Sequence, residues 1–174
     1  GEATPEYLFL PHIPQKVAKV LPYVKLIVLL RHPVDRAYSQ YQHAVVQGHE
    51  TRSFEEAINA QEASLIEEQA KILHDEEYER YTYMQHCYLM RSMYVDQIQR
   101  WMRLFPREQF LILKSEEFYA DPAATLKRVL DFLNVPTSET QLRKSDYKPY
   151  YANHYIEMDT ALRKRLIAFF EPYN

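Results

Sequence analysis

Two short apolar runs interrupt a chain whose remaining pattern is mainly helical. Residues 25–30 are a lysine followed only by aliphatic side chains, and residues 110–113 form a second apolar run. Unbroken runs of this length are typical of strands buried on both faces of a parallel sheet. Strands that alternate with helices predict an α/β fold with a parallel sheet flanked by helices. Because two strands rarely make a complete sheet, we expect an incomplete domain with further strands before Gly1.

Helical spacing and capping residues predict the other elements. A proline at position 33 is placed to open a helix over 33–47. Ser53 and Glu56 form a capping-box pattern, which opens a helix that runs to about residue 60. Asp121 and Asp159 are suited to cap two later helices. We also expect helices at 14–21, at 88–105 and over most of the charged segment 61–83.

Composition narrows the class of protein. With 174 residues, of which 47% are hydrophobic, the chain is long enough for one globular domain with a sizeable core. A formal net charge of −3 argues against nucleic acid as a partner, because that partner needs a strongly basic face. No apolar run is long enough to span a membrane. The single cysteine, Cys87, excludes an intrachain disulfide and the common zinc motifs, and it favours a cytoplasmic location.

The end of the first apolar run carries the clearest candidate chemistry. Arg31 follows the run directly, and Ser39 lies on the helix that is expected to begin at residue 33. A guanidinium offers a rigid fork of donors that suits phosphate, and the start of a helix adds favourable N–H groups. This arrangement predicts an anion site. The plainer interpretation is an ordinary strand-to-helix turn with a surface arginine.

A titratable side chain accompanies Ser39 on the same helix. His43 is four residues further on, and residues four apart share one face of a helix. Histidine exchanges protons near neutral pH, so this face could carry both an anion ligand and a proton acceptor. Arg36 is better interpreted as a structural residue. The same helix is expected to place Asp35 and Gln42 near the face of Ser39, and Tyr38, Tyr41 and Val45 nearer the core.

Residues 25–41 resemble the 3′-phosphate-binding segment of sulfotransferases that use PAPS, 3′-phosphoadenosine 5′-phosphosulfate. The family pattern is a strand followed by Arg-X-Pro-X-X-Arg-X-X-Ser-X-Tyr, and this chain matches every fixed position. The resemblance implies that Arg31 and Ser39 bind the 3′-phosphate of PAPS and of its product PAP. It also implies a P-loop-NTPase-like sulfotransferase fold, of which residues 1–174 would be a single, partial domain.

Two further segments resemble the heparan-sulfate-type and bacterial branch of that family. Residues 1–7 are similar to a segment in which a glutamate is the catalytic base, and Glu2 falls on that glutamate. The branch usually has lysine next, where this chain has Ala3. His43 takes the place of a histidine that lies near the reacting centre in the N-sulfotransferases. The resemblance therefore offers Glu2 and His43 as catalytic residues, and partial burial would bring the pKa of Glu2 toward neutrality.

This chain departs from the family pattern at two places. The 5′-phosphosulfate loop of the family precedes the glutamate, and these residues contain no counterpart of it. Late in the family, a Lys-Gly-Arg loop closes over the 3′-phosphate. The corresponding residues 144–154 contain no glycine, although Lys144 and Lys148 offer positive charge.

The function expected from the resemblance is transfer of a sulfuryl group from PAPS to a hydroxyl or amine acceptor, without a metal ion. The acceptor would be a small molecule or a carbohydrate. A catalytically incomplete sulfotransferase-like interaction module is the alternative. A nucleotide kinase is disfavoured, because it would need an acidic magnesium ligand at a strand end, where this chain has Arg31 and Lys114.

Overall fold

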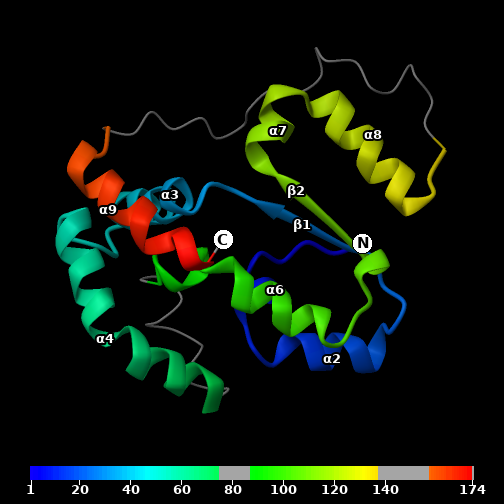
Figure 1. Ribbon diagram of the computed structural model, residues 1–174, viewed down its shortest axis with the longest axis horizontal. Coiled ribbons are helices and arrows are strands. Elements are labelled where there is room, and N and C mark those ends of the chain that lie inside the picture. The colour runs from blue at the N-terminus through cyan, green and yellow to red at the C-terminus, as the bar shows by residue number, and fades with distance from the viewer. Residues whose placement is uncertain (75–86, 137–156, 174) are drawn as a thin grey trace. The chain divides into compact units, whose positions relative to one another are not determined.

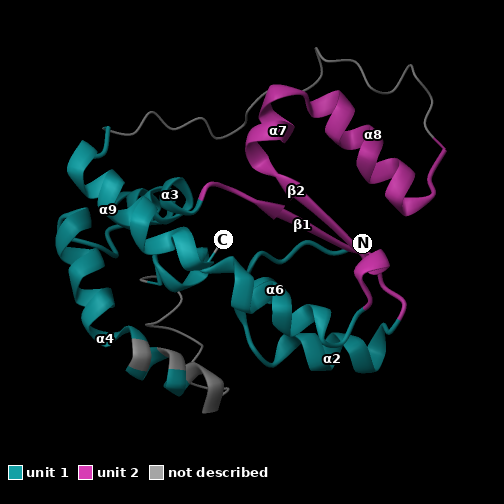
Figure 2. Cartoon of the chain, in the orientation of Figure 1, with its two compact units in different colours: residues 1–22, 33–105, 157–174 teal, residues 23–32, 106–156 magenta. Residues whose placement is uncertain are grey.

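The candidate nucleotide segment runs from one structural unit into another. A computed structural model describes residues 1–74, 87–136 and 157–173 (Figure 1). Unit 1 comprises residues 1–22, 33–105 and 157–174, and unit 2 comprises residues 23–32 and 106–156 (Figure 2). Arg31 belongs to unit 2, whereas the residues from 33 onward belong to unit 1.

Unit 2 contains a parallel pair of strands. Strand β1 (Leu26–Leu30) pairs with β2 (Phe110–Lys114), with Leu26 opposite Phe110 and Leu30 opposite Lys114. Helices α7 (Ser115–Ala120) and α8 (Pro122–Leu133) follow, and both pack against β2. The expected α/β arrangement with a small parallel sheet and flanking helices is thereby confirmed.

Burial of β1 on both faces, in contrast, was a wrong expectation for the residues that the structure describes. Ile27 and Leu29 are 42% and 52% exposed, while the alternate residues Leu26, Val28 and Leu30 are half-buried. Because successive side chains of a strand point to opposite faces, one face of β1 is covered and the other lacks a covering layer in the described part of the chain.

Unit 1 is helical. Its longer helices are α2 (Ile13–Val20), α3 (Pro33–Val46), α4 (Phe54–His74), α6 (Tyr94–Met102) and α9 (Thr160–Phe170). A short α1 (Glu6–Phe9) contacts both α2 and α6, and α9 packs along α3. Three short 3₁₀ turns complete the described elements of the chain, at Met90–Ser92, Arg107–Gln109 and Glu171–Tyr173.

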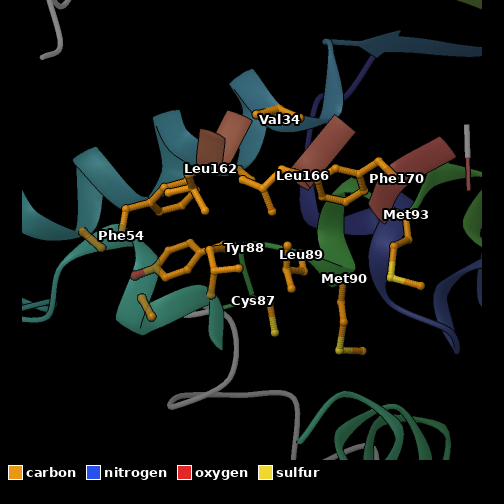
Figure 3. Packing of buried hydrophobic residues seen from close by; sticks show 14 of the residues in the cluster. Val34, Phe54, Cys87, Tyr88, Leu89, Met90, Met93, Leu162, Leu166 and Phe170 are labelled. Atoms are coloured by element: carbon orange, nitrogen blue, oxygen red, sulfur yellow. The ribbon is translucent and has the colours of Figure 1, made fainter. Parts of the chain in front are cut away.

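The core of unit 1 forms where α3, α4 and α9 meet the segment that follows residue 86. Figure 3 shows Val34 from α3 above Leu166 from α9, with the rings of Phe54 and Tyr88 close to each other. Those two ring centroids are 6.4 Å apart in an edge-on arrangement, a geometry that aromatic pairs favour. Burial of these large side chains therefore fixes α3 against its neighbours.

The predicted capping residues begin their helices as expected. The Ser53 N–H donates to Glu56 Oε2 at 2.8 Å, and the Glu56 N–H donates to Ser53 Oγ at 3.3 Å. Asp121 Oδ1 accepts from the Ala124 N–H, and Asp159 Oδ1 caps the start of α9 in the same way. Helix α4 does not end near residue 60 but continues into the charged segment, which is helical as far as residue 74, as expected. Residues 75–86 of that segment lie outside the described residues.

The single helix expected over 88–105 is divided in two. Met93 has φ −87° and ψ 82°, which is not helical, so a 3₁₀ turn precedes it and α6 begins only at Tyr94. The Gln97 side-chain amide donates to the Met90 and Met93 carbonyl oxygens, at 2.9 Å each. A buried amide therefore stabilises a break that hydrophobic spacing alone did not indicate.

Candidate nucleotide-binding site

Helix α3 presents the candidate serine and histidine on a firmly packed support. Val34, Ala37 and Ala44 are buried along its inner side. Ser39 is half-buried, and His43 is exposed one turn later. The helix ends at Val46. Gly48 follows with a φ of 74°, which favours glycine, and the His49 N–H donates to the Ala44 carbonyl oxygen at 2.8 Å.

The inner side of α3 differs from the expected one at a single position. Val45 is 39% exposed, so its expected place nearer the core is wrong, and the smaller Ala44 is buried instead. Tyr38 and Tyr41 do pack against the core, as predicted. A helix advances 100° per residue, so the buried stripe passes through one of two adjacent positions at each turn.

Arg36 holds α3 to the segment before α6. Its Nη2 donates to the Tyr88 carbonyl oxygen at 2.9 Å and to Gln40 Oε1 at 2.8 Å, and its Nε donates to Ser92 Oγ. Ser92 is fully buried, so these bonds satisfy polar groups that water does not reach. The contacts agree with the structural interpretation of this arginine.

Asp35 links the first turn of α3 to α9. Arg163 Nη1 donates to Asp35 Oδ1 at 2.7 Å, and Nη2 donates to Oδ2 at 3.1 Å. The carboxylate holds the pKa of Arg163 above its ordinary value, mainly through this side-chain hydrogen bond. The two-pronged geometry is the one in which guanidinium and carboxylate groups interact most strongly.

Arg31 lies at the exit of β1, next to a carboxylate. Its side chain is exposed, and the backbone N–H of His32 donates to Glu116 Oε1 at 2.8 Å. Burial alone would raise the pKa of Glu116, but the His32 hydrogen bond and the positive charge of Arg31 help to hold that pKa below its ordinary value. The register places Leu30 opposite Lys114, so both strands are followed by polar residues at one edge of the sheet.

Glu2 is held by its own neighbours in the chain. Its Oε1 accepts from the Tyr7 hydroxyl at 2.7 Å and from the Thr4 hydroxyl at 2.9 Å. These hydrogen bonds, that from Tyr7 first, lower the pKa of the Glu2 carboxyl. The side chain is exposed, so the burial that could bring the pKa of Glu2 toward neutrality is absent, and that pKa is lowered instead.

The structure groups some of the candidate residues and separates others by unit. Ser39 and His43 lie one turn apart on α3, and Glu2 belongs to the same unit. Arg31 belongs to unit 2. Lys144 and Lys148, which were the candidate cations of the late loop, lie outside the described residues.

The sequence analysis did not predict two charged residues near the candidate ligands, Glu116 and Arg163. Glu116 directly follows the second apolar run and its serine, so the parallel pairing of the strands was the available signal for its position near Arg31. Arg163 offered no comparable signal, because its partner Asp35 lies 128 residues earlier.

The described residues give no sign of a resident metal or a membrane span. Within residues 1–74, 87–136 and 157–173, no three histidine, cysteine, aspartate or glutamate side chains gather closely enough to hold a metal ion. The helices in the same ranges are too short or too polar to cross a membrane.

Comparison with known proteins relates this chain to sulfotransferases. The sulfotransferase domain family matches residues 3–155. The human bifunctional heparan sulfate N-deacetylase/N-sulfotransferase 2 is 27% identical over 184 residues, which cover 93% of this chain and 19% of that protein. The mouse heparan sulfate glucosamine 3-O-sulfotransferase 3B1 is 29% identical over 135 residues, which cover 77% and 30%.

A solved structure shows the same fold. The crystal structure of a sulfotransferase from Alicyclobacillus acidocaldarius matches with a TM-score of 0.72 and 31% identity, covering 96% of this chain and 58% of that chain. The fold is thus that of a sulfotransferase, and the chain belongs to the sulfotransferase domain family. It spans less than two thirds of the length of each of these three proteins.

Proposed function

We propose that the protein transfers a sulfuryl group from PAPS to a hydroxyl or amine acceptor, with Arg31 and Ser39 binding the 3′-phosphate of the nucleotide. The observation that carries this proposal is the position of Arg31. It has an exposed side chain at the exit of β1, two residues before α3 begins, in a chain of the sulfotransferase family. Only His32 separates Arg31 from the start of the helix that carries Ser39.

The donor set suits a phosphate dianion. The guanidinium of Arg31 has two parallel N–H donors for two phosphate oxygens, and the hydroxyl of Ser39 has a third. A 3′-phosphate is the group that separates PAPS and PAP from ordinary adenine nucleotides. Recognition of that group would therefore give the protein its selectivity for the donor.

The proposed reaction is a direct displacement at sulfur. The bond between sulfur and the bridging oxygen of the 5′-phosphate breaks, and a bond forms between sulfur and the acceptor oxygen or nitrogen. PAP leaves with the electron pair of the broken bond, and the proton of the acceptor passes to a base. Small molecules and carbohydrates are the proposed acceptors, and the names of the heparan sulfate relatives support a carbohydrate.

Glu2 and His43 are the two candidate bases. Glu2 is ionised over a wide pH range because its pKa is lowered, which makes its carboxylate a ready but weak proton acceptor. His43 is exposed on α3, one turn beyond Ser39. Glu2→Gln and His43→Gln separate the two: loss of the true base lowers kcat by about a hundredfold or more, with a smaller change in KM. Full activity in both variants would eliminate both candidates.

Titration calorimetry with PAP tests the nucleotide site. PAP should bind at least about tenfold more tightly than 5′-AMP, which lacks the 3′-phosphate, because a charge-assisted hydrogen bond contributes about 1.5–3 kcal/mol. Arg31→Ala should abolish that preference, and Arg31→Lys should restore it only in part, since lysine lacks the fork. Equal affinities for PAP and 5′-AMP in the unsubstituted chain would refute the proposal.

The same unit offers a matched control. Lys127 is an exposed cation of α8 whose ammonium pairs with Asp131 at 2.8 Å. Lys127→Ala removes one positive charge from unit 2, as Arg31→Ala does, and should leave the preference for PAP unchanged. A loss of preference in both variants would mean that the preference reflects overall charge rather than a site at Arg31.

A sulfotransferase-like interaction module is the second candidate function. The lowered pKa and exposure of Glu2 favour it, since they weaken one of the two candidate bases. Release of PAP from PAPS, measured with alcohol, amine and carbohydrate acceptors, separates the two functions. Binding of PAP without any release of PAP from PAPS would support the module.

We also propose a cytoplasmic location, supported by the buried Cys87 thiol, which forms no disulfide.

A further inference from the structure

The ion pair between Asp35 and Arg163 lies on the helix that carries the proposed phosphate ligand. Asp35, Ser39 and His43 are spaced by four residues along α3, so they share one face of that helix. Asp35 therefore brings a negative charge to the face on which a phosphate dianion is proposed to bind. Like charges repel, so Asp35 alone would oppose that binding.

Arg163 offsets this charge from a different part of the chain. It belongs to α9, and its two Nη atoms donate to both carboxylate oxygens of Asp35. Asp35 lies inside the range matched by the sulfotransferase domain family, residues 3–155, and Arg163 lies beyond it. The pair therefore joins a helix of the matched range to a helix outside it.

We propose that Arg163 is a positioning residue that neutralises Asp35, so that the face of α3 can hold the 3′-phosphate beside Ser39. The inference rests on the proposed function, because it presupposes a phosphate at Ser39. A simple brace between α3 and α9 is the competing explanation. If the pair is a brace, loss of either partner should weaken PAP binding equally. If Arg163 neutralises Asp35, loss of Arg163 should weaken PAP binding, whereas loss of Asp35 should not.

Opposite signs of the two single substitutions provide the test. The full 174-residue chain and its variants are titrated with PAP in calorimetry at low and high salt. Arg163→Gln should weaken PAP binding by about fivefold at low salt and by less at high salt, since the pair is partly exposed. Asp35→Asn should bind PAP at least as tightly as the unsubstituted chain. The double variant should recover most of the affinity that Arg163→Gln loses.

Two further variants distinguish charge from architecture. Arg163→Lys keeps the charge but loses the fork, so neutralisation predicts nearly unchanged PAP affinity while a brace predicts a loss. Arg165→Gln is the matched control, because Arg165 lies on the same helix and its Nη2 donates to Asn59 Oδ1 at 2.8 Å. It should bind PAP like the unsubstituted chain. Thermal unfolding of every variant verifies that the proteins compared are folded.

The outcomes separate this inference from the proposed function. Absence of PAP binding by the unsubstituted chain would overturn the proposed function and the inference with it. If the chain binds PAP and Arg163→Gln changes nothing, the inference alone is wrong. Equal losses in Arg163→Gln and Asp35→Asn, with no recovery in the double variant, would establish the brace and overturn neutralisation.

Discussion

The end of β1 and the first turns of α3 are almost consecutive in the chain, yet they are held in contrasting ways. Val34 and Ala37 of α3 are fully buried, and Arg36 bonds to backbone and side chain in the segment before α6. On β1, Ile27 and Leu29 are exposed. Helix α3, which carries Ser39, is therefore held mainly by packing against the core of unit 1.

Polar side-chain contacts lie at both ends of β1. The His32 N–H donates to Glu116, and at the other end of the strand the Gln109 side chain donates to the Val24 carbonyl at 2.7 Å. Packing against a filled core fixes a position more firmly than a few exposed hydrogen bonds, because each of these contributes little net free energy. Of the two proposed phosphate ligands, Ser39 therefore has the more firmly packed support.

Removing a core side chain from unit 1 should give the largest effect. Leu166 of α9 is fully buried, so Leu166→Ala should lower the free energy of unfolding by about 2–5 kcal/mol through lost burial and a cavity. Urea unfolding measures this loss. Native-state hydrogen exchange should show that amides of α3 lose protection while those of β1 and β2 retain it.

The next residue of the same helix is the control for that experiment. Ile167 is 47% exposed, and Ile167→Ala should cost less than about 1 kcal/mol. If the two alanine variants lost similar stability, or if α3 and β1 lost protection together, the contrast between a packed side and a polar side would be broken.

Acid should weaken the same unit through Glu50, which follows α3. Its carboxylate accepts from Arg52, from the Thr51 N–H and from the Tyr88 hydroxyl, and chiefly the Arg52 side-chain hydrogen bonds lower its pKa to about 2. A lowered pKa stabilises the folded state above the unfolded value of 4.5, and that stabilisation is lost as the pH falls toward 2. We expect a loss of about 1–3 kcal/mol across this window, because the Arg52 side chain is 45% exposed and solvent screens the pair.

Urea unfolding at a series of pH values measures the Glu50 effect. Glu50→Gln should be less stable at neutral pH and should lack most of the decline in acid, since it has no proton to gain. Glu55→Gln, at an exposed position of α4, should keep the decline. An unaltered acid profile in Glu50→Gln would show that other carboxylates cause it.

Short sequence patterns correctly predicted the elements that depend on contacts between residues close together in the chain. Pro33 and the periodicity after it gave nearly the observed bounds of α3, and Ser53 with Glu56 located the start of α4. These elements form through contacts between residues at most one turn apart, so a short stretch of sequence contains the information. The two apolar runs likewise predicted the strands and their parallel pairing.

Long-range and competing interactions caused the failures. Met93 interrupts the expected helix because the Gln97 amide bonds to carbonyls that precede α6. Glu2 was a candidate base whose pKa burial could raise, but it is exposed and hydrogen bonds from Thr4 and Tyr7 lower that pKa. The Asp35–Arg163 pair joins residues that no local spacing relates. The sequence thus predicted the candidate ligands Arg31 and Ser39, but not the charged neighbours Glu116 and Arg163.

The smallest expected effect concerns the cationic side of the proposed site. Glu116→Gln keeps an acceptor for the His32 N–H but removes a negative charge that interacts with Arg31. PAP affinity should rise by about two- to threefold at low salt, and the gain should fade at high salt, because the charges are exposed and screened. Glu116→Ala also loses the acceptor, so it should bind PAP less tightly than Glu116→Gln if the hydrogen bond positions Arg31. Asp131→Asn, which removes a charge from α8, should match the unsubstituted chain. Equal PAP affinity in the glutamine and alanine variants would show that Glu116 acts through its charge alone, and the exit of β1 would then be held by the sheet itself.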